Sequence, residues 1–185
     1  MADDASPRRR AKRPDRHSSE QRSCNMARIR SKDTKPELML RRALHTLGLR
    51  YRLHDGRLPG SPDLVFAGRR AVVFVHGCFW HAHDCPRGVI PGSNVDFWTA
   101  KIDSNVARDD RAVATLLEAG WRVLTVWECV LIGKRKRPVE AVAAEVAAWL
   151  KASVDFDQID GERRWGQPAH VTPEDFPDDV SQVGL

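Results

Sequence analysis

The centre of the chain, residues 71–85, reads AVVFVHGCFWHAHDC. Its first five residues are apolar without interruption, which is typical of a strand buried on both faces of a sheet. Further strand patterns stand before and after it, at 64–66 and at 121–126. Because helical patterns alternate with these strands, the sequence predicts an α/β fold in which helices flank a mixed sheet.

Three helices are predicted around these strands. Thr34 can cap a helix whose third residue, Glu37, completes a capping box. The apolar stripe of this helix consists of Leu40, Leu44 and Leu47. A long helix over 96–119 is expected to turn four residues inward, namely Ile102, Val106, Val113 and Leu117. Pro138 opens the last helix, over 139–150.

The size and composition of the chain exclude several classes of protein. With 185 residues, 42% of them hydrophobic, the chain can form one domain with tails but not two full-sized domains. No stretch approaches the roughly 18 apolar residues of a membrane span, and the N-terminus lacks the apolar segment of a secretory signal. Four cysteines without such a signal predict a reducing compartment, hence the cytoplasm.

Charge divides the chain into three zones. Residues 1–35 carry a net charge of +6, residues 36–152 carry +5 and residues 153–185 carry −6. We therefore predict a disordered basic tail over 1–25, one domain over 26–152, and an acidic, flexible tail from residue 153 to the end. The basic tail either keeps the protein in solution or strengthens a nonspecific attraction to DNA.

Cysteine and histidine are concentrated in residues 78–85, and a further cysteine stands at Cys129. Two thiolates from this segment, one of its two imidazoles and the distant third thiolate can complete a tetrahedral zinc site. Such a site is structural, because no position is left for a reacting water. The alternative is a group of small buried residues with a surface histidine. Since one ion needs only one of His81 and His83, the other is free for acid–base chemistry.

Carboxylates and imidazoles near the strand ends are candidates for catalysis. Asp63 starts one strand and Val75-His76 ends another, which predicts a carboxylate close to a backbone carbonyl and an imidazole, a set that suits Mg²⁺. Alternatively, Asp63 only caps a turn. Glu37 either completes its helix cap or reaches the water shell of the metal. Asp109 is either a solvated carboxylate on a helix or a group that orients a histidine.

Large aromatic residues form two pairs, Phe79-Trp80 and Phe97-Trp98. Core packing is the default role of a tryptophan. Two aromatic residues on a short loop held by a metal cannot easily both point inward, however. Protruding rings beside a basic surface suit insertion between the base pairs of a duplex, which kinks the DNA.

These residues lie in stretches that resemble the very short patch repair (Vsr) DNA mismatch endonucleases. The resemblance covers about residues 26–135, and the combined pattern is specific. The matching stretches are Arg30-Ser31-Lys32-Asp33-Thr34, Leu58-Pro59-Gly60-Ser61-Pro62-Asp63, Phe74-Val75-His76-Gly77-Cys78-Phe79-Trp80-His81, Asp96-Phe97-Trp98, Lys101-Ile102, Asn105, Arg108-Asp109, Gly120-Trp121-Arg122-Val123-Leu124 and Val126-Trp127-Glu128-Cys129.

The resemblance implies a restriction-endonuclease-like fold with a structural zinc ion. It also implies Mg²⁺-dependent nicking of double-stranded DNA at a T:G mismatch, which arises when 5-methylcytosine deaminates. By matching positions, Asp63 and the backbone carbonyl of Val75 hold Mg²⁺, and His81 is the general base. Further active-site positions match His76, Asp109 and Glu37. The zinc ligands match Cys78, His83, Cys85 and Cys129, and the aromatic wedge matches Phe79, Trp80 and Trp98.

The chain departs from the family at Val75, where threonine is frequent, so any role of that hydroxyl is absent or replaced. The second acid and the lysine of the wider nuclease fold are also missing, and His76 and His81 stand in for them. We expect a bacterial, nucleoid-associated monomer whose nick is processed by a repair polymerase and a ligase. The alternatives are a zinc-braced DNA-binding protein without nuclease activity, or a nuclease of this fold with another DNA target.

Overall fold

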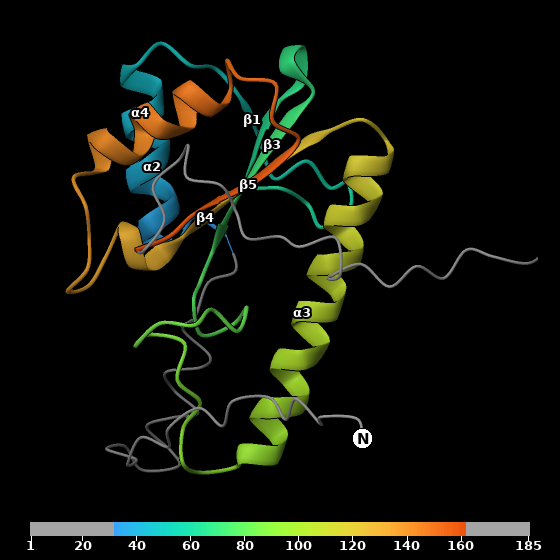
Figure 1. Cartoon of the computed structure of the whole chain (residues 1–185), viewed down its shortest axis with the longest axis vertical. Helices are drawn as coiled ribbons and strands as arrows, with labels where there is room; N and C mark the ends of the chain where they lie inside the picture. Colours follow the sequence, from blue (N-terminus) through green and yellow to red (C-terminus); the bar gives the residue numbers. More distant parts are fainter. Residues whose placement is uncertain (1–31, 162–185) are drawn as a thin grey trace, which may run out of the picture.

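The computed structural model describes residues 32–161 and contains a five-stranded mixed sheet with helices on both faces (Figure 1). The strands are β1 (Arg52–Leu53), β2 (Leu64–Phe66), β3 (Ala71–His76), β4 (Arg122–Trp127) and β5 (Phe156–Ile159). The helices are α2 (Lys35–Thr46), α3 (Val95–Glu118) and α4 (Val139–Trp149), with short 3-10 turns at η1 (Ala67–Arg69) and η2 (Glu128–Val130). The predicted mixed α/β architecture is confirmed.

The strands lie in sequence order, β1-β2-β3-β4-β5. The first three are antiparallel, whereas β3, β4 and β5 are parallel. Helix α3 connects β3 to β4, because a parallel pair needs a long crossover. The pairing of His76 with Trp127 brings the carboxyl ends of β3 and β4 to the same edge of the sheet. The segments that leave this edge, residues 77–94 and η2, supply most of the candidate site.

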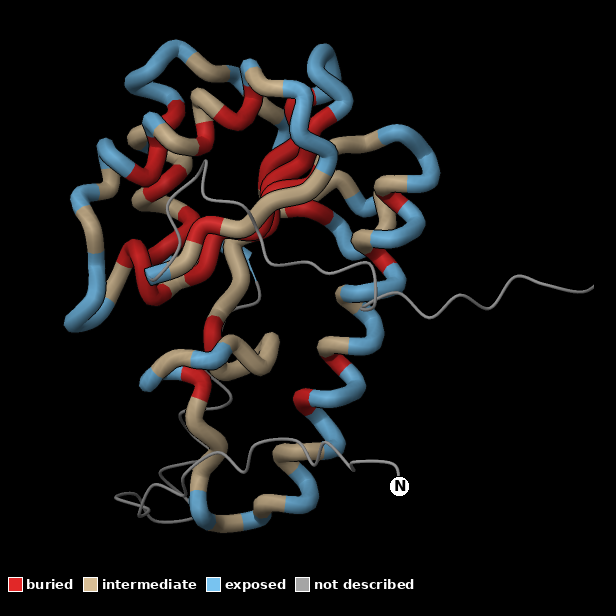
Figure 2. The backbone as a smooth tube through the Cα atoms, in the orientation of Figure 1, coloured by how far each residue is buried: buried red, intermediate tan, exposed pale blue. Residues whose placement is uncertain are grey.

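Alternate residues of the central strands face two different helical layers. Val73 and Leu124 belong to the larger core, together with residues of α2 and α4. Val72 and Val123 belong to the smaller core, together with Leu116 of α3. This alternation explains the uninterrupted apolar sequence of β3, whose first four residues are buried (Figure 2). Burial on both faces makes the middle of the sheet a rigid support for the groups at its edge.

The helix predictions hold for the ends of the helices better than for their faces. The capping box of α2 is present, since Thr34 and Glu37 each bind the backbone of the other. Leu47 is 51% exposed, however, because α2 ends before it. None of the helices among residues 32–161 combines the length and the apolar content that a membrane span requires.

The prediction of the inward face of α3 is wrong at three of the four positions, where the buried residue is the one before the predicted residue. The residues that α3 buries are Ile102, Asn105, Ala112 and Leu116. Asn105 faces inward because its side-chain amide donates to the backbone oxygen of Trp80 at 3.1 Å. The first half of α3 extends beyond the sheet (Figure 1), so a loop rather than an apolar layer determines which face it turns inward.

The boundary predicted at residue 153 is wrong, because residues 156–159 form β5. This strand pairs with β4 in parallel, with Ile159 opposite Val126. Ile159 is fully buried in the larger core. We did not predict this strand because the region is acidic and only one residue of β5, Ile159, is deeply buried. The basic tail predicted over residues 1–25 and the acidic tail beyond residue 161 lie outside the described residues.

Candidate active site and metal centre

A cavity of about 560 Å³ opens between α3, the start of α2 and the ends of β2 and β3. Five of the residues proposed for catalysis or Mg²⁺ binding line it, namely Asp63, Val75, His76, His81 and Asp109. They come from a loop, a strand, a second loop and a helix, so only the fold brings them together. Trp80, Lys32 and Arg108 line the same cavity, which adds an aromatic ring and two cationic groups to its wall.

Asp63 is the last residue of the loop before β2, and its side chain is only 18% exposed. Its Oδ2 accepts a hydrogen bond of 2.7 Å from the backbone N–H of Val75. Because the N–H and the C=O of a strand residue point to the same side, the Val75 carbonyl faces the same edge as Asp63. Burial raises the pKa of Asp63 to about 7, although the Val75 hydrogen bond lowers it. A cation bound here would restore the carboxylate.

Two imidazoles and a carboxylate form a second group in the cavity lining. The rings of His76 and His81 are stacked, with their centres 3.9 Å apart and their planes at 8°. His81 Nδ1 is hydrogen-bonded to Asp109 Oδ2, so its Nε2 is left for other contacts. Burial lowers the pKa of His76 to about 3, which keeps that ring neutral at pH 7. Burial alone would raise the pKa of Asp109. The hydrogen bond from His81 and the nearby positive charge outweigh this effect, so the pKa is lowered overall and Asp109 stays ionised.

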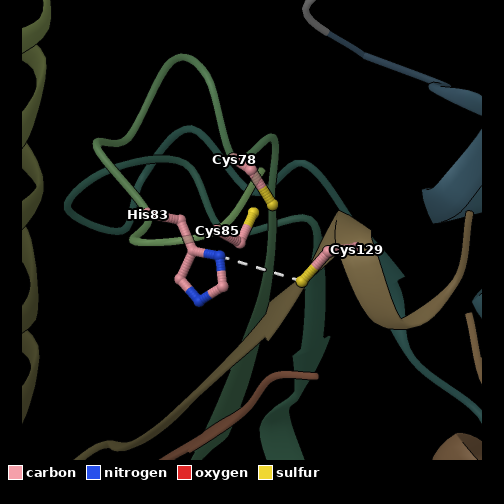
Figure 3. Close-up of side chains that lie close together, drawn as sticks. All are labelled: Cys78, His83, Cys85 and Cys129. Atoms are coloured by element: carbon pink, nitrogen blue, oxygen red, sulfur yellow. Dashed lines mark hydrogen bonds between the residues drawn. The ribbon is translucent and has the colours of Figure 1, made fainter. Parts of the chain in front are cut away.

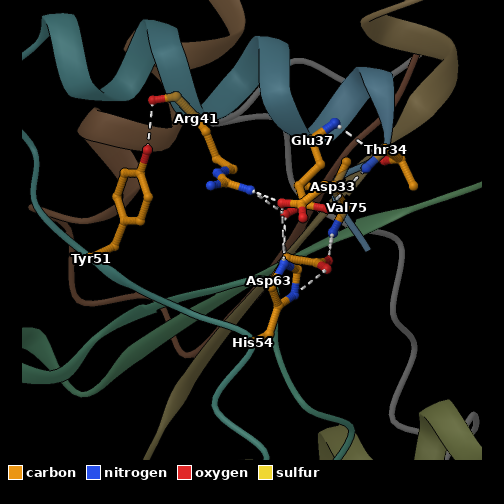
Figure 4. Close-up of polar contacts among 8 residues, drawn as sticks. All are labelled: Asp33, Thr34, Glu37, Arg41, Tyr51, His54, Asp63 and Val75. Atoms are coloured by element: carbon orange, nitrogen blue, oxygen red, sulfur yellow. Dashed lines mark hydrogen bonds and ion pairs between the residues drawn. The ribbon is translucent and has the colours of Figure 1, made fainter. Parts of the chain in front are cut away.

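Glu37 is buried, with 1% of its side chain exposed, and takes part in two sets of contacts (Figure 4). Its Oε2 accepts from the backbone N–H of Thr34 at 3.3 Å, which completes the helix cap. Its Oε1 lies 3.1 Å from Arg41 Nη1 and 3.1 Å from His54 Nε2. The capping role is thus confirmed. The second oxygen faces His54, which stands between Glu37 and Asp63.

His54 and Asp33 are site residues that sequence reasoning missed. His54 Nδ1 lies 3.7 Å from Asp63 Oδ1, and its Nε2 lies 3.8 Å from Asp33 Oδ1 (Figure 4). Both distances are longer than a hydrogen bond, and Nε2 has no hydrogen-bond partner among residues 32–161. Atoms of Asp33, Glu37 and His54 lie within 4.8 Å of one another. Arg41 already forms ion pairs with the carboxylates of Asp33 and Glu37, so its guanidinium supplies the positive charge of this cluster.

The expected zinc ligands converge on one point (Figure 3). The ligand atoms of Cys78, His83, Cys85 and Cys129 all lie within 4.8 Å of one another. A tetrahedral zinc ion with Zn–S bonds of about 2.3 Å holds its sulfurs roughly 3.8 Å apart, so this donor set fits zinc. The structure also separates the two imidazoles that the sequence left open: His83 joins the sulfurs, whereas His81 stacks on His76 in the cavity.

Cys78 and Cys129 interact directly within this cluster. The hydrogen bond from Cys78 lowers the pKa of the Cys129 thiol, while the same contact raises the pKa of Cys78. Gly88 keeps the loop tight, because a Cβ at this position would come within 2.0 Å of the carbonyl oxygen of His83. The loop backbone is therefore shaped to present His83 and Cys85 toward the strand ends.

The three aromatic residues proposed as a wedge form one group. Phe79, Trp80 and Trp98 contact one another edge to face, with ring centres 5.0 to 6.1 Å apart. Phe97, which we did not assign to the wedge, contacts Trp98 at 5.1 Å and is 61% exposed. This group joins the loop after β3 to the start of α3, so the fold gathers aromatic side chains next to the cavity that Trp80 lines.

Comparison with known proteins agrees with this geometry. A family model described as DNA mismatch endonuclease Vsr matches residues 14–87. The DNA mismatch endonuclease Vsr of Escherichia coli K12 is 43% identical over 146 residues, which cover 79% of this chain and 94% of that protein. The type II nicking enzyme V.XorIIP of Xanthomonas oryzae pv. oryzae is 53% identical over 117 residues, which cover 63% of this chain and 86% of that enzyme. The chain therefore belongs to the Vsr family of DNA mismatch endonucleases.

Proposed function

We propose that this chain is a Mg²⁺-dependent endonuclease that nicks one strand of duplex DNA at T:G mismatches. The nick would start very short patch repair of mismatches left by deamination of 5-methylcytosine. One observation carries the proposal: a carboxylate, a histidine–carboxylate pair and an aromatic side chain share a single cavity in a chain of the Vsr family. The type II nicking enzymes among its relatives support a single-strand cut.

The Asp63 carboxylate and the Val75 carbonyl would hold Mg²⁺. Oxygen ligands of this kind suit the ion, which when bound stabilises the charge that develops on the scissile phosphate. The fit rests on Asp63 itself, whose carboxylate is buried and is repelled by the carboxylate of Glu37 on the far side of His54, so that a nearby cation relieves both desolvation and repulsion. Since Val75 would contribute only its backbone, the loss of the threonine hydroxyl is compatible with this role.

His81 is the proposed general base. Its Nδ1 is tied to the ionised Asp109, which leaves Nε2 to take a proton from the attacking water. Asp109 fixes the tautomer and the orientation of the ring. His76, neutral and stacked on His81, restrains the same ring from one face. Hydrolysis would leave a 5′-phosphate and a 3′-hydroxyl at the nick.

The remaining features support binding to duplex DNA. Lys32 and Arg108 line the cavity and can contact phosphates. Phe79, Trp80 and Trp98 would insert between base pairs, where unstacking costs a few kcal/mol for each step. Zinc held by the three cysteines and His83 would brace the loop that carries Phe79 and Trp80. The mixed sheet, with its site at one edge, is compatible with the restriction-endonuclease-like fold that we propose for the chain.

Cleavage of defined plasmids tests the proposal. A supercoiled plasmid with one T:G pair, incubated with the protein and Mg²⁺, should become an open circle, whereas the matched plasmid should stay supercoiled. The nick should map to the strand that carries the mismatched T. Omission of Mg²⁺ and the His81→Ala variant should each abolish nicking. An enzyme that cuts matched and mismatched plasmids equally would remove the mismatch claim.

The Asp63→Ala variant tests the rival interpretation of a DNA-binding protein without nuclease activity. If the chain is a nuclease, this variant should still bind the mismatched duplex but should not nick it. If the chain only binds DNA, neither the wild type nor the variant should nick any substrate, although both retain binding. A panel of other mismatches in varied flanking sequences would identify a nuclease with a different target.

A further inference from the structure

The last residues of the described chain, from Gln158 to Gly161, surround the cysteine–histidine cluster. Ile159 points into the larger core and pairs with Val126. Because side chains alternate along a strand, Gln158 and Asp160 point to the face opposite Ile159. A small pocket lined by His83, Cys85 and Cys129 also includes Asp160 and Gly161 in its wall. This part of the chain plays no role in the function proposed above.

His83 is contacted on its edge by Asp160. Its Nδ1 faces the cluster, 3.7 Å from Cys129 Sγ (Figure 3). Its Nε2 lies 3.7 Å from Asp160 Oδ2, within the range of an ion pair. An imidazole that binds a metal through Nδ1 must carry its proton on Nε2. A carboxylate at Nε2 favours that tautomer and makes Nδ1 a better ligand.

The face of the same ring is held by Trp127. The two rings are stacked at 4.2 Å with an angle of 17° between their planes. The indole N–H of Trp127 donates to Gln158 Oε1 at 2.9 Å. Gln158 thus holds the indole ring of Trp127, against which the imidazole of His83 is stacked. In addition, the backbone N–H of Gly161 donates to the sulfur of Cys129. Three separate contacts therefore link residues 158–161 to the cluster.

We propose that Asp160 is a positioning residue of the zinc site, which selects the Nε2-protonated tautomer of His83, and that Gln158 supports it through Trp127. This inference rests on the proposed zinc site. It gives β5 a role beyond packing, since the strand carries Gln158 and is followed directly by Asp160. It also makes the metal affinity of the loop after β3 depend on residues about 75 positions further along the chain.

Zinc competition with the full-length protein tests the inference. Zinc content is measured first, and the zinc-loaded protein is then titrated with a chromogenic chelator. Removal of a carboxylate that orients a metal-bound histidine typically weakens binding by about 10 to 100-fold. Asp160→Ala should fall in this range, whereas Asp160→Glu should recover much of the affinity. Gln158→Ala should have a smaller effect in the same direction.

Asp155→Asn is the matched control. It removes one negative charge from an exposed position just before β5 and should retain wild-type zinc affinity.

The tautomer provides a readout that general destabilisation would not change. In zinc-loaded wild-type protein, long-range ¹H–¹⁵N spectra should show His83 bound through Nδ1 and protonated at Nε2. The Nε2 proton should exchange with solvent much faster in Asp160→Ala. Wild-type zinc affinity in Asp160→Ala, or coordination of His83 through Nε2, would overturn the inference while leaving the zinc site intact. Absence of zinc from the wild type would instead overturn the zinc site itself, and this inference with it.

Discussion

Asp63 shows at the scale of one residue how a site can be built at the expense of stability. Its carboxyl group is only 18% exposed, and this burial, together with the negative charge of Glu37 beyond His54, raises its pKa to about 7 from an ordinary value of 3.8. Between these two pH values the folded protein binds a proton that the unfolded chain releases. Without a metal, ionisation of Asp63 therefore destabilises the folded state as the pH rises from about 4 to about 7.

Asp63→Asn should consequently abolish nicking yet stabilise the protein in magnesium-free buffer at pH 8. The asparagine oxygen can still accept from the N–H of Val75, but no charge is buried. One unit of pKa corresponds to about 1.4 kcal/mol, so the free energy of unfolding should rise by about 1 to 3 kcal/mol. Urea denaturation at pH 8 and pH 4, without chelator so that zinc is retained, measures this. The gain should disappear at pH 4, and an equal gain at both pH values would contradict the assignment.

Asp109 and Asp110 are adjacent carboxylates with different environments. Asp109 is bonded to His81 in the cavity, whereas Asp110 is exposed on the outer side of α3. Asp109→Asn should lower the single-turnover rate of nicking by about 10 to 100-fold, because His81 loses the group that orients it. Asp110→Asn should stay within about twofold of the wild type. Gel-shift binding of the mismatched duplex should be unchanged in both variants, and a loss of binding in Asp109→Asn would point to DNA contact instead of positioning.

At the scale of one element, α3 does two jobs along its length. Its second half packs on the sheet through Leu116. Its first half leaves the sheet and carries Trp98 toward the aromatic residues of the loop. Asp109 and Asn105 lie between these parts and contact His81 and the backbone of Trp80. Helix α3 thus holds the loop after β3 in position beside the cavity, through its contacts with His81 and Trp80.

A pair of neighbouring leucines tests which face of α3 is buried. Leu116 is fully buried in the smaller core, whereas Leu117 is only partly buried at its edge. Leu116→Ala should lower the free energy of unfolding by about 2 to 5 kcal/mol, the usual cost of a cavity in a packed core. Leu117→Ala should cost about 1 kcal/mol or less. Chemical denaturation of both variants measures the difference, and a larger loss for Leu117→Ala would restore the face predicted from the sequence.

At the scale of the whole molecule, the cysteine–histidine cluster joins parts of the chain that are far apart. Cys78 follows β3, Cys129 lies in η2 after β4, and Cys85 belongs to the loop between them. Both Cys78 and Cys129 are buried in the larger core. A zinc ion here would tie the ends of the two central strands to each other and to the loop that carries the aromatic residues.

Removal of zinc should therefore destabilise the whole fold. Ligand binding and folding are coupled in structural zinc sites, so apo-protein made with a strong chelator should melt at least about 10 °C lower than the zinc-loaded protein. Differential scanning calorimetry, with metal content verified for each sample, measures the change. Restored zinc should return the midpoint to its first value. An unchanged melting curve after verified loss of zinc would show that the cluster is not a structural site.

Local patterns determined much of this protein before any contact between distant residues was known. The apolar sequence of β3 predicted a central strand, Thr34 and Glu37 predicted the start of α2, and the spacing of cysteines and histidines predicted the cluster. These features follow from the repeat of a strand, the geometry of a helix end and the coordination of one ion, all of which act over a few residues.

Tertiary structure alone decided the features that depend on contacts across the fold. His54 lies between Glu37 and Asp63 because β1 and α2 meet there, and no local pattern of charge or apolarity marks it. The inward face of α3 depends on the loop that holds Trp80, and β5 stays on the sheet because Ile159 finds a place beside Val126. In each of these cases the free energy comes from partners distant in sequence, and the residues by themselves are compatible with more than one arrangement.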